Sequence, residues 1–247
     1  MNDINSSVGC LYGVGLGPGD PDLVTVKAAK IIATTQVVAY FAKQGARGKA
    51  RAILDHWRSE TCLQLPLLYP LTTETHFCDP VYIKTLNGFY ADAEAAIAAH
   101  LLAGRDVALV CEGDPLFYGS FMHLYIRLKD RFRIEIIPGV TGMSGCWSAA
   151  KAPMAWGDDV LSVLPGTLDN KTLVRHLTTA DAVVIIKIGA NLAKIRAAIV
   201  EAGRLPGAIY VEHGTSETEN ILPLAGKLDG HAPYFSSILI PGNGRRP

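Results

Sequence analysis

The sequence lacks the features of a cysteine-based framework. Its five cysteines, in a chain of 247 residues, include no Cys-x-x-Cys pair and are odd in number. Neither a zinc site nor a set of disulfides is expected from this pattern. The seven histidines show no metal-ligand spacing either, so we expect no bound metal.

Net charge and long apolar runs are also missing. The 23 Lys and Arg balance the 23 Asp and Glu, so no strong overall field would draw the protein to nucleic acid or to an anionic membrane. No apolar run reaches the roughly 20 residues of a membrane span. The N-terminal residues show no basic region followed by an apolar stretch. We expect a cytoplasmic protein with no nucleic-acid or membrane partner.

The apolar residues that are present indicate α/β architecture. Hydrophobic residues make up 49% of the chain, and short apolar runs alternate with longer segments of helical period. The expected strands cover residues 9–14, 36–40, 62–65, 106–111, 133–137, 160–164, 182–188, 208–212 and 236–240. The expected helices cover residues 21–33, 50–57, 79–103, 115–128 and 191–202. A change in composition after Gly139 predicts two α/β domains, residues 1–139 and 140–247.

The glycine cluster after the first strand fails the spacing of a dinucleotide-binding fingerprint. Counting from Gly13 places Pro18 at the third glycine, and counting from Gly15 places Asp20 there. Residues 23–54 contain no carboxylate that could bind a ribose. Asp20 also puts a negative charge where a pyrophosphate would sit. A dinucleotide-dependent oxidoreductase is therefore disfavoured, and the ligand should not be a polyphosphate.

Two similar turns follow apolar strands, with the sequence GPGDP at residues 17–21 and GDP at residues 113–115. The second turn follows a continuous apolar strand, at the carboxyl end where open α/β sheets bind ligands. An ordinary strand-to-helix turn with Asp114 as N-cap would give the same local sequence. We expect the two turns to face one cofactor site.

Three segments together resemble the tetrapyrrole methylase family. They are GxGxGPGDP at residues 13–21, EGDPLFYGS at residues 112–120 and IPGVTG at residues 137–142. The resemblance implies two α/β domains with S-adenosylmethionine bound in the cleft between them, S-adenosylhomocysteine as product, and a homodimer. Because this cofactor carries a sulfonium and an ammonium but no phosphate, acidic residues beside glycine turns suit it.

Within that family, YPLTTE at residues 69–74 and the glutamate at position 112 resemble the branch that methylates C-20 of precorrin-2 in cobalamin synthesis. A cobalt-containing form of the substrate is an alternative that the sequence leaves open. Uroporphyrinogen III, diphthine and ribosomal RNA methylases would share the turns. A non-catalytic ligand-binding protein is disfavoured, because the cofactor turns are intact in both halves.

The resemblance also places residues at the cofactor. Five lie in the first predicted domain, namely Pro18, Glu112, Gly113, Asp114 and Phe117. The others lie in the second predicted domain and are Thr141, Gly142, Lys187, Ile188, Val211 and Glu212. A base that removes a proton from the methylated carbon is not assigned by this pattern. His213, Tyr118 and Glu112 are the candidates, although packing, capping or cofactor contacts would equally explain them.

The densest positive run lies just after the second expected strand, at residues 43–51. Tetrapyrrole precursors carry many carboxylates, and arginine suits bidentate carboxylate contacts. We hypothesise that Lys43, Arg47, Lys49 and Arg51 steer and hold the substrate. A solvated loop is the alternative interpretation.

Overall fold

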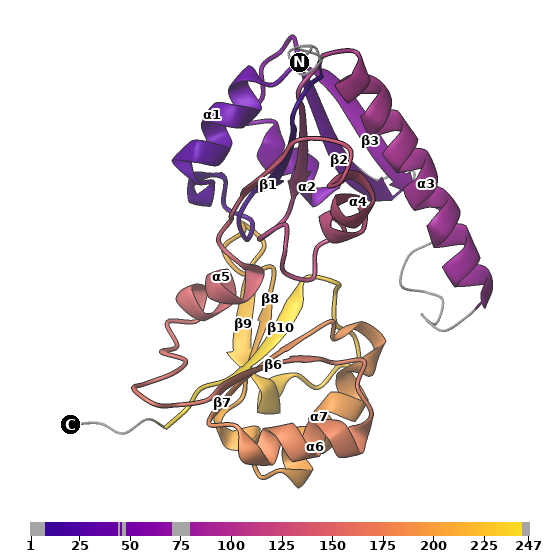
Figure 1. The fold of residues 1–247 in the computed structure, drawn as a ribbon. Coiled ribbons are helices and arrows are strands. Elements are labelled where there is room, and N and C mark those ends of the chain that lie inside the picture. Colours follow the sequence, from indigo (N-terminus) through magenta and orange to yellow (C-terminus); the bar gives the residue numbers. More distant parts are fainter. Residues whose placement is uncertain (1–7, 44, 46–47, 71–79, 244–247) are drawn as a thin grey trace. The chain divides into compact units, whose positions relative to one another are not determined.

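The structure is a computed structural model that describes residues 8–43, 45, 48–70 and 80–243 (Figure 1). The chain divides into two compact units, Met1–Thr141 and Gly142–Pro247. Each unit has its own five-stranded sheet and its own core. In the part of the chain that the structure describes, no helix combines the length and apolarity needed to cross a membrane.

The first unit is built on a fully parallel sheet with the strand order β3-β2-β4-β1-β5. Its elements are β1 (Leu11–Gly15), the 3₁₀ turn η2 (Pro21–Leu23), α1 (Val26–Thr34), β2 (Val37–Lys43), α2 (Lys49–Leu54), β3 (Leu63–Tyr69), α3 (Pro80–Leu102), β4 (Val107–Cys111), α4 (Phe121–Leu128) and β5 (Ile134–Ile137).

Helices cover both faces of this sheet, so its central strands are apolar on both sides. Along β2, Val37 and Ala39 pack into the cluster that includes α3 and α4, whereas Val38 and Tyr40 pack into the cluster that includes α1 and α2. This division matches the alternation of side chains along a strand. The polar residues of the strand-end loops therefore gather at the edges of the sheet.

The second unit has a mixed sheet with the strand order β6-β7-β10-β8-β9. Its elements are α5 (Gly142–Ala149), β6 (Leu161–Pro165), α6 (Asn170–Thr179), β7 (Ala182–Ile186), η3 (Gly189–Asn191), α7 (Leu192–Glu201), η4 (Leu205–Gly207), β8 (Ile209–Glu212), β9 (Asn220–Pro223), η5 (Leu224–Gly226) and β10 (Ser236–Ile240). Residues of α6 and α7 pack into one core cluster of this unit, and residues of α5 pack into another.

Two of the expected helices begin later than the sequence predicts. The helix expected over residues 21–33 is a 3₁₀ turn followed by α1. Thr25 is the N-cap of α1, and its hydroxyl accepts a hydrogen bond from the Ala28 N–H at 3.3 Å. The helix expected over residues 115–128 begins at Phe121. Before it, Tyr118 has a φ of 54°, which a regular helix does not allow. The elements α5, α6 and β9 were not predicted.

Candidate functional site

The carboxyl ends of β1 and β4 lie at the point where the first sheet reverses its winding. These strands are neighbours, yet the chain leaves β1 toward β2 on one side and leaves β4 toward β5 on the other. Ligands of open α/β sheets bind at such a switch point. Both sequence-predicted turns start here, because each directly follows one of these two strands.

The two turns are hydrogen-bonded to each other. The Gly113 N–H donates to the Gly17 carbonyl at 2.7 Å, and the Gly17 N–H donates to the Gly113 carbonyl at 3.4 Å. Both glycines have a positive φ, of 79° at Gly17 and 66° at Gly113, and residues other than glycine rarely adopt this backbone conformation. The two turns therefore lie side by side, as a shared cofactor site would require.

A third glycine turn, after β5, packs against the first two. We call the three close-packed glycines of these strand ends, Gly15, Gly113 and Gly139, the glycine platform. Asp114 Oδ2 accepts a hydrogen bond from the Gly139 N–H at 3.2 Å, which ties the end of β4 to the end of β5. Gly15 lies between them, and a Cβ added to it would be 2.6 Å from the Gly113 oxygen and from the Gly139 Cα and N. Only glycines allow three strand ends to pack this closely.

The acidic residues of the turns are held by backbone donors. Asp20 Oδ1 accepts from the Asp22 N–H at 2.9 Å, and Asp114 Oδ1 accepts from the Leu116 N–H at 2.9 Å. Glu112 Oε1 accepts from the Ala50 N–H at 2.9 Å, at the start of α2. These backbone donors hold each of the three carboxylates in place.

Phe117 and Tyr118 form the tip of the segment that joins β4 to α4. Their rings meet edge to face, with centroids 4.9 Å apart. Tyr118 is 44% exposed and adopts the left-handed backbone conformation already noted. Strained backbone of this kind persists where the surrounding contacts enforce it, and such positions are frequent at functional sites.

In the second unit, the predicted residues lie at the carboxyl edge of its sheet. β6 is parallel to β7, and β10 pairs antiparallel with both β7 and β8, so β6, β7 and β8 all end at the same edge. Lys187 directly follows β7 with a φ of 56°, and His213 directly follows β8 with a φ of 50°. Ile188 and Val211 are fully buried in the core. Neither residue therefore presents its side chain to a ligand.

Glu212 belongs to a network that holds the end of β8. Its Oε1 accepts hydrogen bonds from Lys227 Nζ and from the Tyr210 hydroxyl, each at 2.8 Å, and its Oε2 accepts from Asn220 Nδ2 at 3.4 Å. Burial alone would raise the pKa of Glu212, but these three donors together lower it below its ordinary value. Burial raises the pKa of Tyr210 to about 12, assisted by its bond to Glu212. This carboxylate is thus firmly fixed beside His213.

The basic run is only partly described by the structure. Lys43 is the last residue of β2, and Lys49 is the first residue of α2, while Arg47 lies outside the described residues. Arg51 donates from Nε to Asp55 at 2.8 Å and from Nη1 to the Tyr40 hydroxyl at 3.1 Å. These contacts use two of its five donors and fasten α2 to β2.

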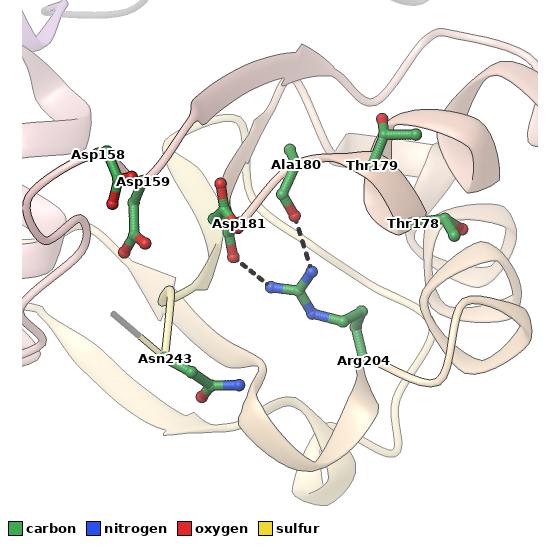
Figure 2. Close-up of a pocket in the computed structure, with 8 residues that line it drawn as sticks. All are labelled: Asp158, Asp159, Thr178, Thr179, Ala180, Asp181, Arg204 and Asn243. Atoms are coloured by element: carbon green, nitrogen blue, oxygen red, sulfur yellow. Dashed lines mark hydrogen bonds between the residues drawn. The ribbon is translucent and has the colours of Figure 1, made fainter. Parts of the chain in front are cut away.

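A pocket of about 430 Å³ lies elsewhere in the second unit (Figure 2). Asp159 and Asp181 line it just before β6 and β7 begin, so it is at the amino edge of the sheet and not at the edge of Lys187. Arg204, which also lines it, donates to the carbonyls of Ala180 and Asp181 at 3.0 and 2.7 Å. The arginine thereby caps the end of α6, which is a structural role.

Gly15 and Gly166, which let strand ends pack together, received no site role from the sequence pattern. Gly15 entered only through the dinucleotide spacing and the motif at residues 13–21, and Gly166 did not enter at all. A Cβ on Gly166 would lie 3.0 Å from the Lys187 oxygen, so this glycine adjoins the end of β7. The signal that could have found it is the Pro-Gly pair at the end of an apolar strand, at residues 165–166 as at 138–139.

Known proteins resemble this chain over nearly its whole length. The family model of tetrapyrrole (corrin/porphyrin) methylases matches residues 10–229. The precorrin-2 C(20)-methyltransferase of a Sinorhizobium species is 52% identical over 240 residues, which are 97% of this chain and 98% of that protein. The cobalt-precorrin-2 C(20)-methyltransferase of Salmonella typhimurium is 27% identical over 235 residues, which are 94% of this chain and 96% of that protein.

Solved structures share the fold. A cobalt precorrin-4 methyltransferase of cobalamin synthesis superposes with a TM-score of 0.71 at 23% identity, covering 93% of each chain. Uroporphyrin-III C-methyltransferase from Thermus thermophilus, complexed with S-adenosylhomocysteine, superposes with a TM-score of 0.67 at 20% identity. That match covers 94% of this chain and 97% of the Thermus protein. The expected fold class is confirmed by these likenesses.

Proposed function

Because this chain belongs to the tetrapyrrole (corrin/porphyrin) methylase family, we propose that it transfers a methyl group from S-adenosylmethionine to C-20 of precorrin-2, in cobalamin synthesis. The observation that carries this proposal is the 52% identity to a precorrin-2 C(20)-methyltransferase over 97% of the chain. The much lower identity to the cobalt-precorrin-2 enzyme, 27%, favours the metal-free substrate. The enzyme is a methyltransferase of this family in either case.

The turns of the first unit suit the cofactor in charge. Close packing at Gly15, where an added Cβ would meet the main chain of Gly113 and Gly139 at 2.6 Å, brings these turns together. The carboxylates of Asp114 and Glu112 suit the ammonium group of a sulfonium amino acid. Pro18, Gly113, Phe117 and Thr141 complete the proposed contacts of this unit, and Gly142, the first residue of the second unit, follows them.

Lys187, Ile188, Val211 and Glu212 are the proposed contacts of the second unit. Because Ile188 and Val211 are buried, they would support this edge of the sheet from the core. Glu212 would act by holding the end of β8, since its carboxylate already accepts three hydrogen bonds. These assignments follow the resemblance and the position of the residues at one sheet edge.

When bound, S-adenosylmethionine supplies an electrophilic methyl group. The chain's own task is to align C-20 with that methyl group and to exclude water, which can supply much of the acceleration of an in-line displacement. C-20 forms a bond to the methyl carbon as the bond from carbon to sulfur breaks, and the proton on C-20 is then lost. His213, Tyr118 and Glu112 remain the candidates for accepting that proton.

The remaining expectations complete the proposal. We infer a homodimer that acts in the cytoplasm on a small tetrapyrrole, with Lys43, Arg47, Lys49 and Arg51 attracting its carboxylates. Arg51 is held by Asp55 and Tyr40, so it would contribute through its remaining donors.

Product analysis tests the function. The purified protein is incubated with S-adenosylmethionine and precorrin-2, with and without cobalt, and the product is followed by mass and absorbance. We expect one added methyl group on the metal-free substrate. Methylation of neither form would contradict the proposal, and methylation of the cobalt form alone would reassign the substrate.

A further inference from the structure

Ser120 stands at the N-cap position of α4, directly before Phe121, but its side chain does not cap the helix. A serine at this position usually accepts a hydrogen bond from the helix's own N–H groups, which contributes about 1 kcal/mol. Ser120 has helical backbone angles, φ −65° and ψ −21°, and its side chain makes no cap bond. Its hydroxyl instead accepts a hydrogen bond from the Tyr69 hydroxyl. The serine therefore serves a long-range contact in place of a local one.

Tyr69 is held firmly enough to direct that contact. It is the last residue of β3, and its ring stacks on Phe41 with centroids 5.5 Å apart and packs on Phe89 at 4.6 Å. Its hydroxyl also lies 3.2 Å from the Tyr90 hydroxyl. Since β2 separates β3 from β4 in the sheet, the bond to Ser120 reaches across one strand.

The segment from Gly113 to Ser120 is thus attached at three places. Gly113 is bonded to Gly17 at 2.7 Å, Asp114 is bonded to Gly139 at 3.2 Å, and Ser120 is bonded to Tyr69. The strained residue Tyr118, with a φ of 54°, lies between the second and third attachments. A tyrosine in the left-handed backbone conformation costs on the order of 1 kcal/mol, so the chain on both sides of Tyr118 must be held in place. Tyr69 supplies the restraint on the C-terminal side.

We propose that Tyr69 is a positioning residue, which acts through Ser120 to hold the Phe117–Tyr118 tip in the conformation that methyl transfer requires. The catalytic consequence rests on the proposed function. The restraint itself does not, because it concerns only contacts within the first unit. Tyr69 thus links the end of β3 to the segment at residues 112–120.

Hydrogen exchange tests the restraint without any substrate. Tyr69→Phe removes the hydroxyl and keeps the ring packing, and Ser120→Ala removes the acceptor. Losing one hydrogen bond of about 1 kcal/mol should speed exchange of the Phe117 and Met122 amides roughly fivefold. The control is Tyr125→Phe, in the same helix, where we expect no change. Unchanged exchange in both variants would overturn the proposal, whatever the enzyme methylates.

Kinetics and cofactor affinity test the positioning role. We expect each single variant to lower kcat about tenfold or more, and the double variant to be no worse than either, because the two side chains act as one unit. Ser120→Thr, which keeps a hydroxyl, should restore most of the rate. Independent, additive losses would refute the link between the residues. If the wild type methylates no tetrapyrrole, the proposed function fails. The same two single variants and the double variant are then compared by their Kd for S-adenosylhomocysteine, and additive losses of affinity would again refute the link between Tyr69 and Ser120.

Discussion

Replacing Gly15 with alanine probes the packing of the three strand ends. The added Cβ would lie 2.6 Å from the Gly113 oxygen and from Gly139 main-chain atoms. Contacts between carbon atoms are relaxed at about 3.5 Å, so the ends of β4 and β5 must move apart by roughly 1 Å. Because the contacting atoms are backbone, no side-chain rotation can relieve the clash.

The cost of Gly15→Ala can be bounded. Overpacking of this kind costs about 1–3 kcal/mol, which corresponds to a fall in Tm of roughly 2–12 °C for a protein of this size. A displacement of about 1 Å beside the reacting groups can slow catalysis about 100-fold. We therefore expect a folded protein at 25 °C with a moderately lower Tm and a strongly reduced rate of methyl transfer.

The assay compares Gly15→Ala with Gly88→Ala by thermal unfolding and by methyl-transfer rate. Gly88 lies within α3, and a Cβ there meets nothing within 4 Å. An alanine in a helix interior should stabilise the protein by about 0.5–1 kcal/mol and leave the rate unchanged. If Gly15→Ala is as stable and as active as Gly88→Ala, the platform of close-packed glycines is not required.

Three other changes give distinct outcomes. The pKa of Glu212 is lowered below 4.5 in the folded protein, so its contribution to stability is present above about pH 4.5 and is lost as the pH falls through the folded pKa. Glu212→Gln should therefore flatten this part of a plot of unfolding free energy against pH. An unchanged slope would contradict the role of the ion pair between Glu212 and Lys227. His213→Ala should keep at least about a tenth of the wild-type turnover, since an essential general base would cost 100-fold or more; loss of activity with intact cofactor binding would identify His213 as the base. The Arg47→Ala and Arg51→Ala double variant should weaken tetrapyrrole binding about tenfold at low salt, and an unchanged Kd in calorimetry would remove the substrate-binding hypothesis.

The sequence was sufficient for the features that depend on local pattern. Apolar runs located the strands that precede the two turns, and the structure places Gly17 against Gly113, as the predicted shared site requires. The resemblance supplied the family and the fold class. These features are readable because strand periodicity and glycine turns leave a signature in neighbouring residues.

Features that depend on distant partners could not be predicted. Nothing near Asp114 indicates that its carboxylate binds Gly139, and nothing near Ser120 indicates that its hydroxyl binds Tyr69 in place of capping α4. The helix expected from residue 115 begins only at Phe121 for a related reason. The side chain of Asp114 and the left-handed backbone of Tyr118 hold residues 115–120 in a turn. Local propensity was overridden by contacts made 25 and 51 residues away.

Isotope labelling tests most directly whether this methyltransferase acts on C-20 of precorrin-2. S-adenosylmethionine labelled with ¹³C in its methyl group, incubated with the enzyme and precorrin-2, places the label where the reaction occurs. We expect a single labelled methyl group whose ¹³C resonance and couplings assign it to C-20. A label at any other carbon of the macrocycle, or no label in the tetrapyrrole, would contradict it.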